Sequence, residues 1–65
     1  MKNDVVIFGR ACVNHPELNV SVGRTLLGTF RVVFRDNEAG AVIESRVFNQ
    51  YANAHEYAQR LINQD

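Results

Sequence analysis

Cys12 and His15 have the spacing in this chain that most resembles a metal-binding pair. A Cys-x-x-His pair could chelate a metal ion, with His55 as a third ligand. Structural zinc sites use four ligands, usually as two chelating pairs, and this chain supplies one pair and a distant histidine. We therefore expect no metal ion and no other cofactor.

The same cysteine could act as a nucleophile with His15 or His55 as its base. Such catalysis also needs a cleft, an oxyanion site and a group that orients the base. A chain of 65 residues buries only about 60% of the surface that its unfolded form exposes, which leaves little room for a cleft. The sequence therefore predicts no catalytic residues and a protein that is not an enzyme.

Arginine is the other residue type in this chain that could contribute to a functional site. Seven basic and seven acidic residues give a net charge of zero, whereas a protein that binds duplex DNA normally has a basic excess. Six of the basic residues are arginines, which form bidentate contacts better than lysine does. Their position in the fold therefore matters more than their number. They are Arg10, Arg24, Arg31, Arg35, Arg46 and Arg60.

Residues 26–35 alternate as a β-strand does, and we expect a strand over about 25–35. One side of it is apolar and should face the core: Leu26, Gly28, Phe30, Val32 and Phe34. The other side mixes arginines with apolar residues: Leu27, Thr29, Arg31, Val33 and Arg35. A face that only meets solvent would not need this mixture, so function is expected there.

Three further segments also read as strands. We expect strands over about 4–13 and 41–48, with a hairpin loop in the Asp/Asn/Gly-rich residues before the latter. A short strand over 18–22 is left open. In the first strand the odd positions, such as Val5 and Ile7, are assigned to the core.

The last segment predicts a helix over about 53–63. Asn53 followed by Glu56 resembles a capping box. An apolar stripe follows at helical spacing: Ala54, Tyr57, Ala58, Leu61 and Ile62. The predicted fold is α+β: a single domain, residues 1–65, in which an antiparallel β-meander of three or four strands carries one C-terminal α-helix on one face.

One helix covers one face of such a sheet and leaves the other open. The residues expected to bind a partner there are Phe8, Arg10, Leu27, Arg31, Val33, Arg35 and Arg46. Two hairpin registers are possible. A loop over 37–40 places Arg31 opposite Arg46, whereas a loop over 36–39 pairs it with Glu44.

Arginine, aromatic and aliphatic residues together are typical of the centres of protein interfaces. We expect a non-enzymatic interaction module that binds a protein partner, or a second copy of itself as a homodimer, through the open face or an edge strand. The alternative is single-stranded nucleic acid, with bases stacked on Phe8 and phosphates on the arginines. Charges that merely face solvent are the third interpretation.

The expected compartment is the cytoplasm. One cysteine allows no internal disulfide, which favours a reducing environment. The apolar run over residues 5–8 is too short for a signal peptide or for the roughly 20 residues that span a bilayer. Small, neutral chains of this kind also suit accessory proteins of phages and mobile elements that bind and block a host factor.

Overall fold

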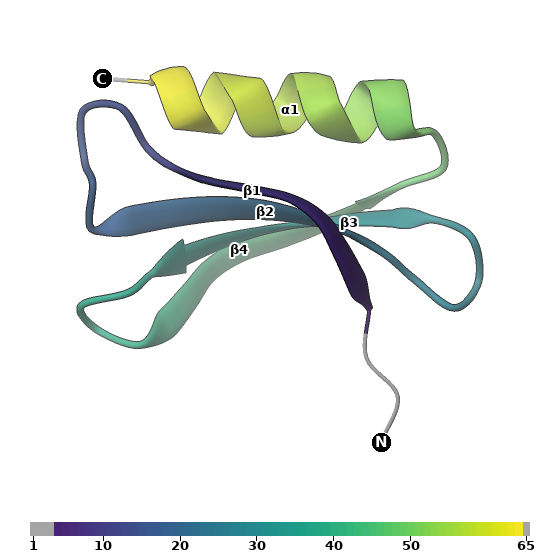
Figure 1. The fold of residues 1–65 in the computed structure, drawn as a ribbon, viewed down its shortest axis with the longest axis horizontal. Helices are drawn as coiled ribbons and strands as arrows, with labels where there is room; N and C mark the ends of the chain where they lie inside the picture. The colour runs from purple at the N-terminus through teal and green to yellow at the C-terminus, as the bar shows by residue number, and fades with distance from the viewer. Residues whose placement is uncertain (1–3, 65) are drawn as a thin grey trace.

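The computed structural model describes residues 4–64, which form four β-strands followed by one α-helix. The elements are β1 (Val5–Ala11), β2 (Leu18–Arg24), β3 (Phe30–Asp36), β4 (Ala41–Phe48) and α1 (Tyr51–Asn63). The strands pair antiparallel in chain order, and α1 lies across one side of the sheet (Figure 1). This confirms the predicted α+β class and meander. Of the predicted domain 1–65, residues 1–3 and 65 lie outside the described part.

The segment left open by the sequence is a central strand. β2 pairs with β1 on one side and β3 on the other, and its Val20 and Val22 are both 0% exposed. Both valines face α1, with Ser21 between them on the opposite side. Five residues of clear alternation were therefore enough to form a strand that holds the middle of the core.

The core lies between α1 and the side of the sheet that it covers, here called the helix face. Ala54 and Ala58 are 0% exposed, and their small side chains let the helix approach the strands closely. Ile62, at 1% exposure, is the largest of the fully buried side chains. The remaining buried residues are Cys12, Val20, Val22, Val32, Phe34 and Leu61.

The predicted strand over 25–35 begins only at Phe30, because a tight turn precedes it. The Thr25 N–H donates to the Thr29 carbonyl at 2.9 Å, which closes a loop around Leu26, Leu27 and Gly28. The Thr25 hydroxyl accepts the N–H groups of Leu27 and Thr29, each at 3.2 Å. Gly28 has a φ of 85°, a conformation that favours glycine. Turn chemistry therefore overrides the strand propensity of the leucines.

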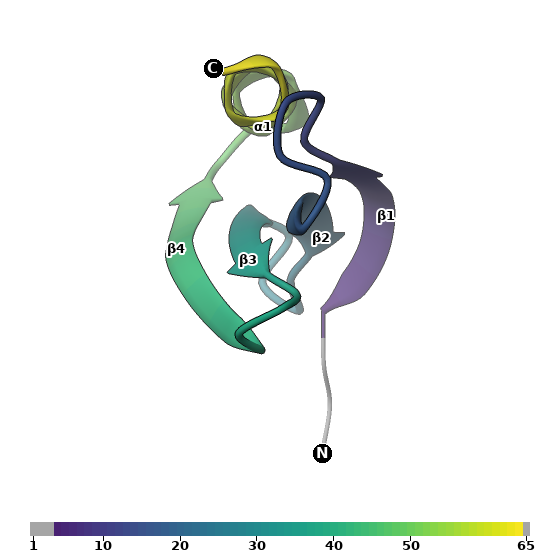
Figure 2. The same cartoon turned by 90° about the vertical axis from the view of Figure 1, so that its left-hand side faces the viewer.

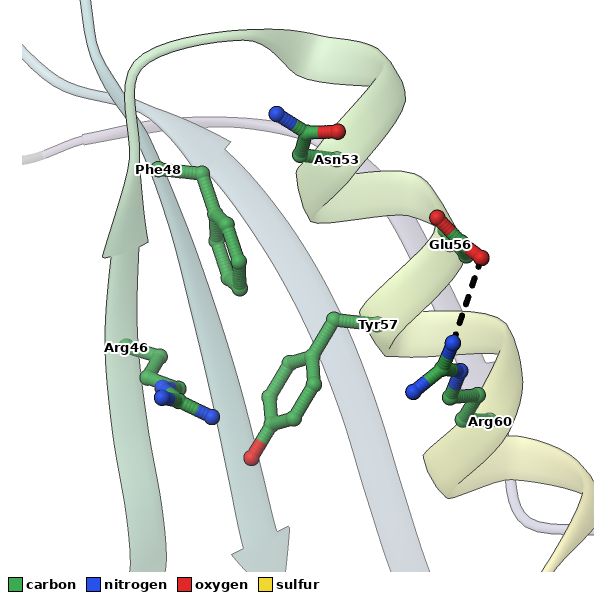
Figure 3. Close-up of a pocket in the computed structure, with 6 residues that line it drawn as sticks. All are labelled: Arg46, Phe48, Asn53, Glu56, Tyr57 and Arg60. Atoms are coloured by element: carbon green, nitrogen blue, oxygen red, sulfur yellow. Dashed lines mark hydrogen bonds and ion pairs between the residues drawn. The ribbon is translucent and has the colours of Figure 1, made fainter.

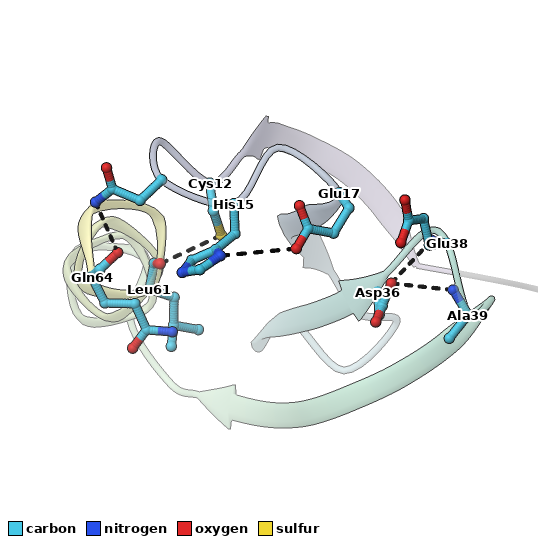
Figure 4. Close-up of polar contacts among 9 residues, drawn as sticks. Cys12, His15, Glu17, Asp36, Glu38, Ala39, Leu61 and Gln64 are labelled. Carbon is cyan, nitrogen blue, oxygen red and sulfur yellow. Dashed lines mark hydrogen bonds and ion pairs between the residues drawn. The ribbon is translucent and has the colours of Figure 1, made fainter.

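The β3–β4 hairpin has the loop over 37–40, one of the two alternatives, but a β-bulge changes the residue that faces Arg31. The hairpin starts with Asp36 opposite Ala41, and the Asp36 carboxylate accepts the N–H groups of Glu38 and Ala39 in the loop (Figure 4). The pairing then shifts by one residue between Phe34 and Arg35. Arg31 consequently lies opposite Val47, rather than opposite Arg46 or Glu44.

The side assignment of β1 was wrong from Phe8 onward, although Val6 lies on the open side as predicted. Val5 and Ile7, assigned to the core, are 61% and 46% exposed. Phe8 and Cys12 pack in or against the core instead. A register shift between Val6 and Phe8 interrupts the strand's alternation. Since both sides of this strand are apolar in sequence, periodicity could not choose between them.

The helix begins two residues before the predicted start, so the Asn53–Glu56 capping box is not formed. Gln50 is the N-cap and makes no side-chain cap hydrogen bond. Tyr51 packs against Phe30 with ring centroids 5.6 Å apart, so tertiary packing holds the first turn. At the other end the Val13 N–H donates to the Ile62 carbonyl at 2.9 Å.

No helix found within residues 4–64 has the length and apolar character that crossing a bilayer requires.

Val32 and Val33 provide a matched test of the two sides of β3. Val32 is 1% exposed on the helix face, and Val33 is half-buried on the other side. We expect Val32→Ala to lower the free energy of unfolding by about 2 kcal/mol through lost burial and a cavity. Val33→Ala, with the same change in strand propensity, should cost less than about 1 kcal/mol. Urea denaturation in dilute solution measures both, and equal losses would contradict the assignment.

Candidate functional site: the open sheet face

The side of the sheet turned away from α1, here called the open face, is arranged in three cross-strand rows. Figure 2 shows α1 lying on the opposite side of the twisted sheet. The first row is Val6, Gly23, Arg31 and Val47. The central row is Gly9, Ser21, Val33 and Ser45. The third row is Ala11, Asn19, Arg35 and Val42.

Three exposed aliphatic side chains lie on this face: Val6, Val42 and Val47. The bulge of each edge strand adds an exposed isoleucine at the edge of the sheet. Ile7 lies between Val6 on the open face and Phe8 on the helix face, and Ile43 lies between Val42 and Glu44 in the same way. Ile7 and Ile43 are 46% and 52% exposed.

Two arginines of β3 lie on the open face in different electrostatic settings. Arg31 Nη1 lies 3.2 Å from Asp4 Oδ2, and both side chains are partly solvated, so the pair contributes little stability. Asp4 lies above Gly23, where an added Cβ would come within 3.0 Å of the Asp4 Cβ. Arg35 is exposed and forms no ion pair within 4 Å in residues 4–64. The face therefore carries one uncompensated positive charge.

The structure brings together only part of the predicted binding set. Arg31, Val33 and Arg35 lie side by side on the open face as expected. Leu27 lies beyond the sheet, at the β2–β3 turn, and is 91% exposed.

Three predicted residues, Phe8, Arg10 and Arg46, lie on the helix face and not on the open face. Phe8 packs against His55 with ring centroids 5.2 Å apart. Arg10 and Arg46 lie opposite the buried Val20 and Val32. The β1 misassignment and the β4 bulge account for these errors.

All four phenylalanines and both tyrosines belong to the helix side of the molecule. The phenylalanines pack in or against the core, and the tyrosines lie on α1. In residues 4–64 the open face consequently has no aromatic side chain. The predicted platform, with bases stacked on Phe8 beside Arg31 and Arg35, is therefore not formed.

A groove between β4 and α1, of about 310 Å³, was missed by sequence reasoning (Figure 3). It is lined by Arg46, Phe48, Asn53, Glu56, Tyr57 and Arg60. Helix and strand residues meet there only because the β4 bulge turns Arg46 and Phe48 toward α1. Its volume reaches only the lower end of the range for ligand pockets.

The polar groups of the groove are largely committed to holding α1 against β4. The Tyr57 hydroxyl donates to Glu44 Oε2 at 2.6 Å, and the Arg46 guanidinium lies 5.2 Å from the centre of the Tyr57 ring. Arg60 pairs with Glu56 at 3.3 Å. Burial, then the hydrogen bond to Glu44, raises the pKa of Tyr57. These residues therefore form a packing contact between α1 and β4 that includes a cation–π interaction.

The cysteine and the histidines do not converge. The Cys12 thiol is 3% exposed and donates to the Leu61 carbonyl at 3.5 Å, while His15 faces Glu17 at 3.8 Å (Figure 4). Burial raises the pKa of Cys12, and Glu17 raises it further. His55 packs between the rings of Phe8 and Tyr51. The described residues contain no group of three side chains arranged to hold a metal ion.

Comparisons of this chain with family models, with curated proteins and with solved structures give no match.

The Tyr57–Glu44 contact gives a pKa prediction. Glu44→Gln removes a carboxylate that would repel the phenolate, so the pKa of Tyr57 should fall toward its ordinary value. Phenolate absorbance, titrated in a Tyr51→Phe background, reports Tyr57 alone. Glu38→Gln, in the β3–β4 loop, is the matched control and should leave the titration unchanged. An unchanged or higher pKa in Glu44→Gln would contradict the contact.

Proposed function

We propose that this chain is a non-enzymatic interaction module that binds a protein surface through the open face. The observation that supports this most is the set of aliphatic side chains on that face, Val6, Val42 and Val47, which are 51% to 65% exposed. No element within residues 4–64 covers them. Burial of one such side chain contributes about 1.5–3 kcal/mol at most, so a few together can supply binding energy. Several exposed aliphatic side chains on one face of a small sheet favour an interaction site there.

The bulges favour binding through the face over binding through an edge. Both edge strands, β1 and β4, contain a register shift. Bulges at sheet edges bend the strand and interrupt the ladder that an added strand would need. The same bulges leave Ile7 and Ile43 exposed at the two edges of the sheet.

The β2–β3 turn extends this surface beyond the sheet. Leu26 and Leu27 are 73% and 91% exposed, at the corners of a turn that Thr25 holds closed. Corner positions of a tight turn leave no core within reach of these side chains. The turn bends away from α1, toward the side of the open face (Figure 1). The proposed partner therefore presents apolar surface, with an acidic or polar group to meet Arg35.

The open face is better suited to a protein than to single-stranded nucleic acid. Nucleic-acid platforms stack bases on aromatic side chains, and the open face has none within the described residues. The chain's net charge of zero also provides no general attraction for phosphates.

We place this activity in a reducing compartment, the cytoplasm, because the one cysteine is a buried free thiol. Blocking a host factor, as a phage accessory protein would, is one form that such binding could take.

Photo-crosslinking in the cells that produce the protein tests the proposed surface. A photoreactive residue in place of Ser45, exposed in the central row, should give discrete protein adducts. The same residue in place of Ala52, exposed on α1, is the matched control and should give none. Val33→Asp should abolish the Ser45 adducts, because it places a charge in the contact. Equal labelling from both positions, or none from Ser45, would show that the open face is only solvated.

A further inference from the structure

We infer that a second copy of this chain occupies the open face, forming a symmetric dimer in which two sheets pack face to face. This inference rests on the proposed function of the open face and names its partner. The distribution of large and small side chains on the open face, its charges and its area support this dimer.

Along the strands, the open face divides into a half with mostly small side chains, here called the low half, and a half with mostly large side chains, here called the high half. On β1 and β2 the residues of the central and third rows are mostly small: Gly9, Ala11, Asn19 and Ser21. On β3 and β4 most open-face side chains are large: Arg31, Val33, Arg35, Val42 and Val47. Val6, at the start of β1, is the large side chain of the low half.

A two-fold axis parallel to the strands, between β2 and β3, fits the high half of one copy to the low half of the other. Such an axis places β3 of each copy over β2 of its partner and β4 over β1, with rows preserved. Val33 then faces Ser21 of the second copy, Val42 faces Ala11, and Val47 meets Val6 in an aliphatic contact. Side chains of two packed sheets interdigitate across a spacing of about 10 Å, so Val33 and Val42 fill the space that Ser21 and Ala11 leave. The usual angle of about 30° between packed sheets leaves the central row in register.

The charges of the open face agree with the same axis. The first row places Arg31 of each copy over Gly23 of the other, where Asp4 lies. Asp4 therefore comes between two arginines, its own at 3.2 Å and that of the second copy. Arg35 faces Asn19, whose amide oxygen can accept a hydrogen bond. A net charge of zero means that two copies do not repel each other at long range.

The area of the face sets the strength of the dimer. Four strands of about seven residues present roughly 19 Å by 24 Å, or about 450 Å² per copy and 900 Å² in total. This lies between the areas of incidental contacts, below about 800 Å², and of stable interfaces, above about 1,200 Å². The dimer should therefore be reversible, with a dissociation constant in the micromolar range.

Sedimentation velocity over a series of protein concentrations tests the inference. The wild-type chain should shift from monomer to dimer as the concentration rises through the micromolar range. Ser21→Arg fills the low half opposite Val33 and should weaken the dimer by tenfold or more. Ala52→Arg adds the same side chain to the exposed side of α1 and should leave the dimer unchanged. A wild-type chain that stays monomeric, or a dimer that Ser21→Arg does not weaken, would overturn the inference.

A mixing experiment tests the axis without depending on how Ser21→Arg folds. Asp4→Arg and Arg31→Asp each place like charges on both sides of the first-row contact, so each variant alone should be mainly monomeric. Neither variant keeps the Asp4–Arg31 pair within the chain. Mixed together, they should form a heterodimer with opposite charges facing each other, and absence of that heterodimer would overturn the arrangement.

The crosslinking from Ser45 separates this inference from the proposed function. An adduct of twice the mass of the chain supports the second copy. Heavier adducts alone, together with a monomeric purified chain, overturn the second copy and leave the protein-binding proposal standing. No adducts at all overturn both.

Discussion

The one-residue register shift in the β3–β4 hairpin is the constraint on which the rest of the structure depends. Before the shift, Arg35 lies opposite Val42, and after it Phe34 lies opposite Glu44. Side chains alternate along a strand, so one extra residue reverses the facing of everything that follows it. Phe48 and Arg46 thereby meet α1, while Val47 and Ser45 join the open face. Without the shift, β4 would present an arginine and a glutamate beside Arg31.

The sequence pattern predicted the facing of an element correctly where one side of that element was apolar and the other was not. The helix stripe from Ala54 to Ile62 and the division of β3 into Val32 and Val33 sides were both assigned correctly. It failed in β1, where Val5 and Val6 are equally apolar and a bulge interrupts the period. A bulge has no composition signal of its own, because it results from the balance of pairing and packing across neighbouring strands.

Turn hydrogen bonds and tertiary contacts explain the remaining differences between the predicted and the observed secondary structure. Residues 25–29 have the pattern of a strand because leucine and threonine are both compatible with extended backbone. The hydrogen bonds by which Thr25 closes the turn cannot be predicted from residue spacing. The helix starts at Tyr51 because the Phe30 ring lies where it can pack against Tyr51. Asn53 offered a better cap, but a cap contributes only about 1 kcal/mol, and packing of the first turn outweighs it. The groove at Tyr57 was unforeseeable for the same reason, since it needs the facing of β4.

The thin core and the open apolar face both follow from the packing of one helix on a four-stranded sheet. A single helix of thirteen residues can bury only one side of a four-stranded sheet. The aliphatic residues of the other side then remain in contact with water unless a further layer covers them. A second sheet would supply that layer and complete a molecule whose own core is small. Stability and binding would then be coupled, since a partner that binds only the folded chain also stabilises it.

The central claim is that the bulges leave one side of the sheet packed and the other open. Methyl NMR with a soluble paramagnetic agent tests this claim most directly. In dilute solution, the methyl signals of Val20, Val22 and Val32 should be protected, since these residues are 0% to 1% exposed. Those of Ile43 and Val47, both 52% exposed, should broaden strongly. Protection of Ile43 and Val47 together with broadening of Val32 would contradict the account.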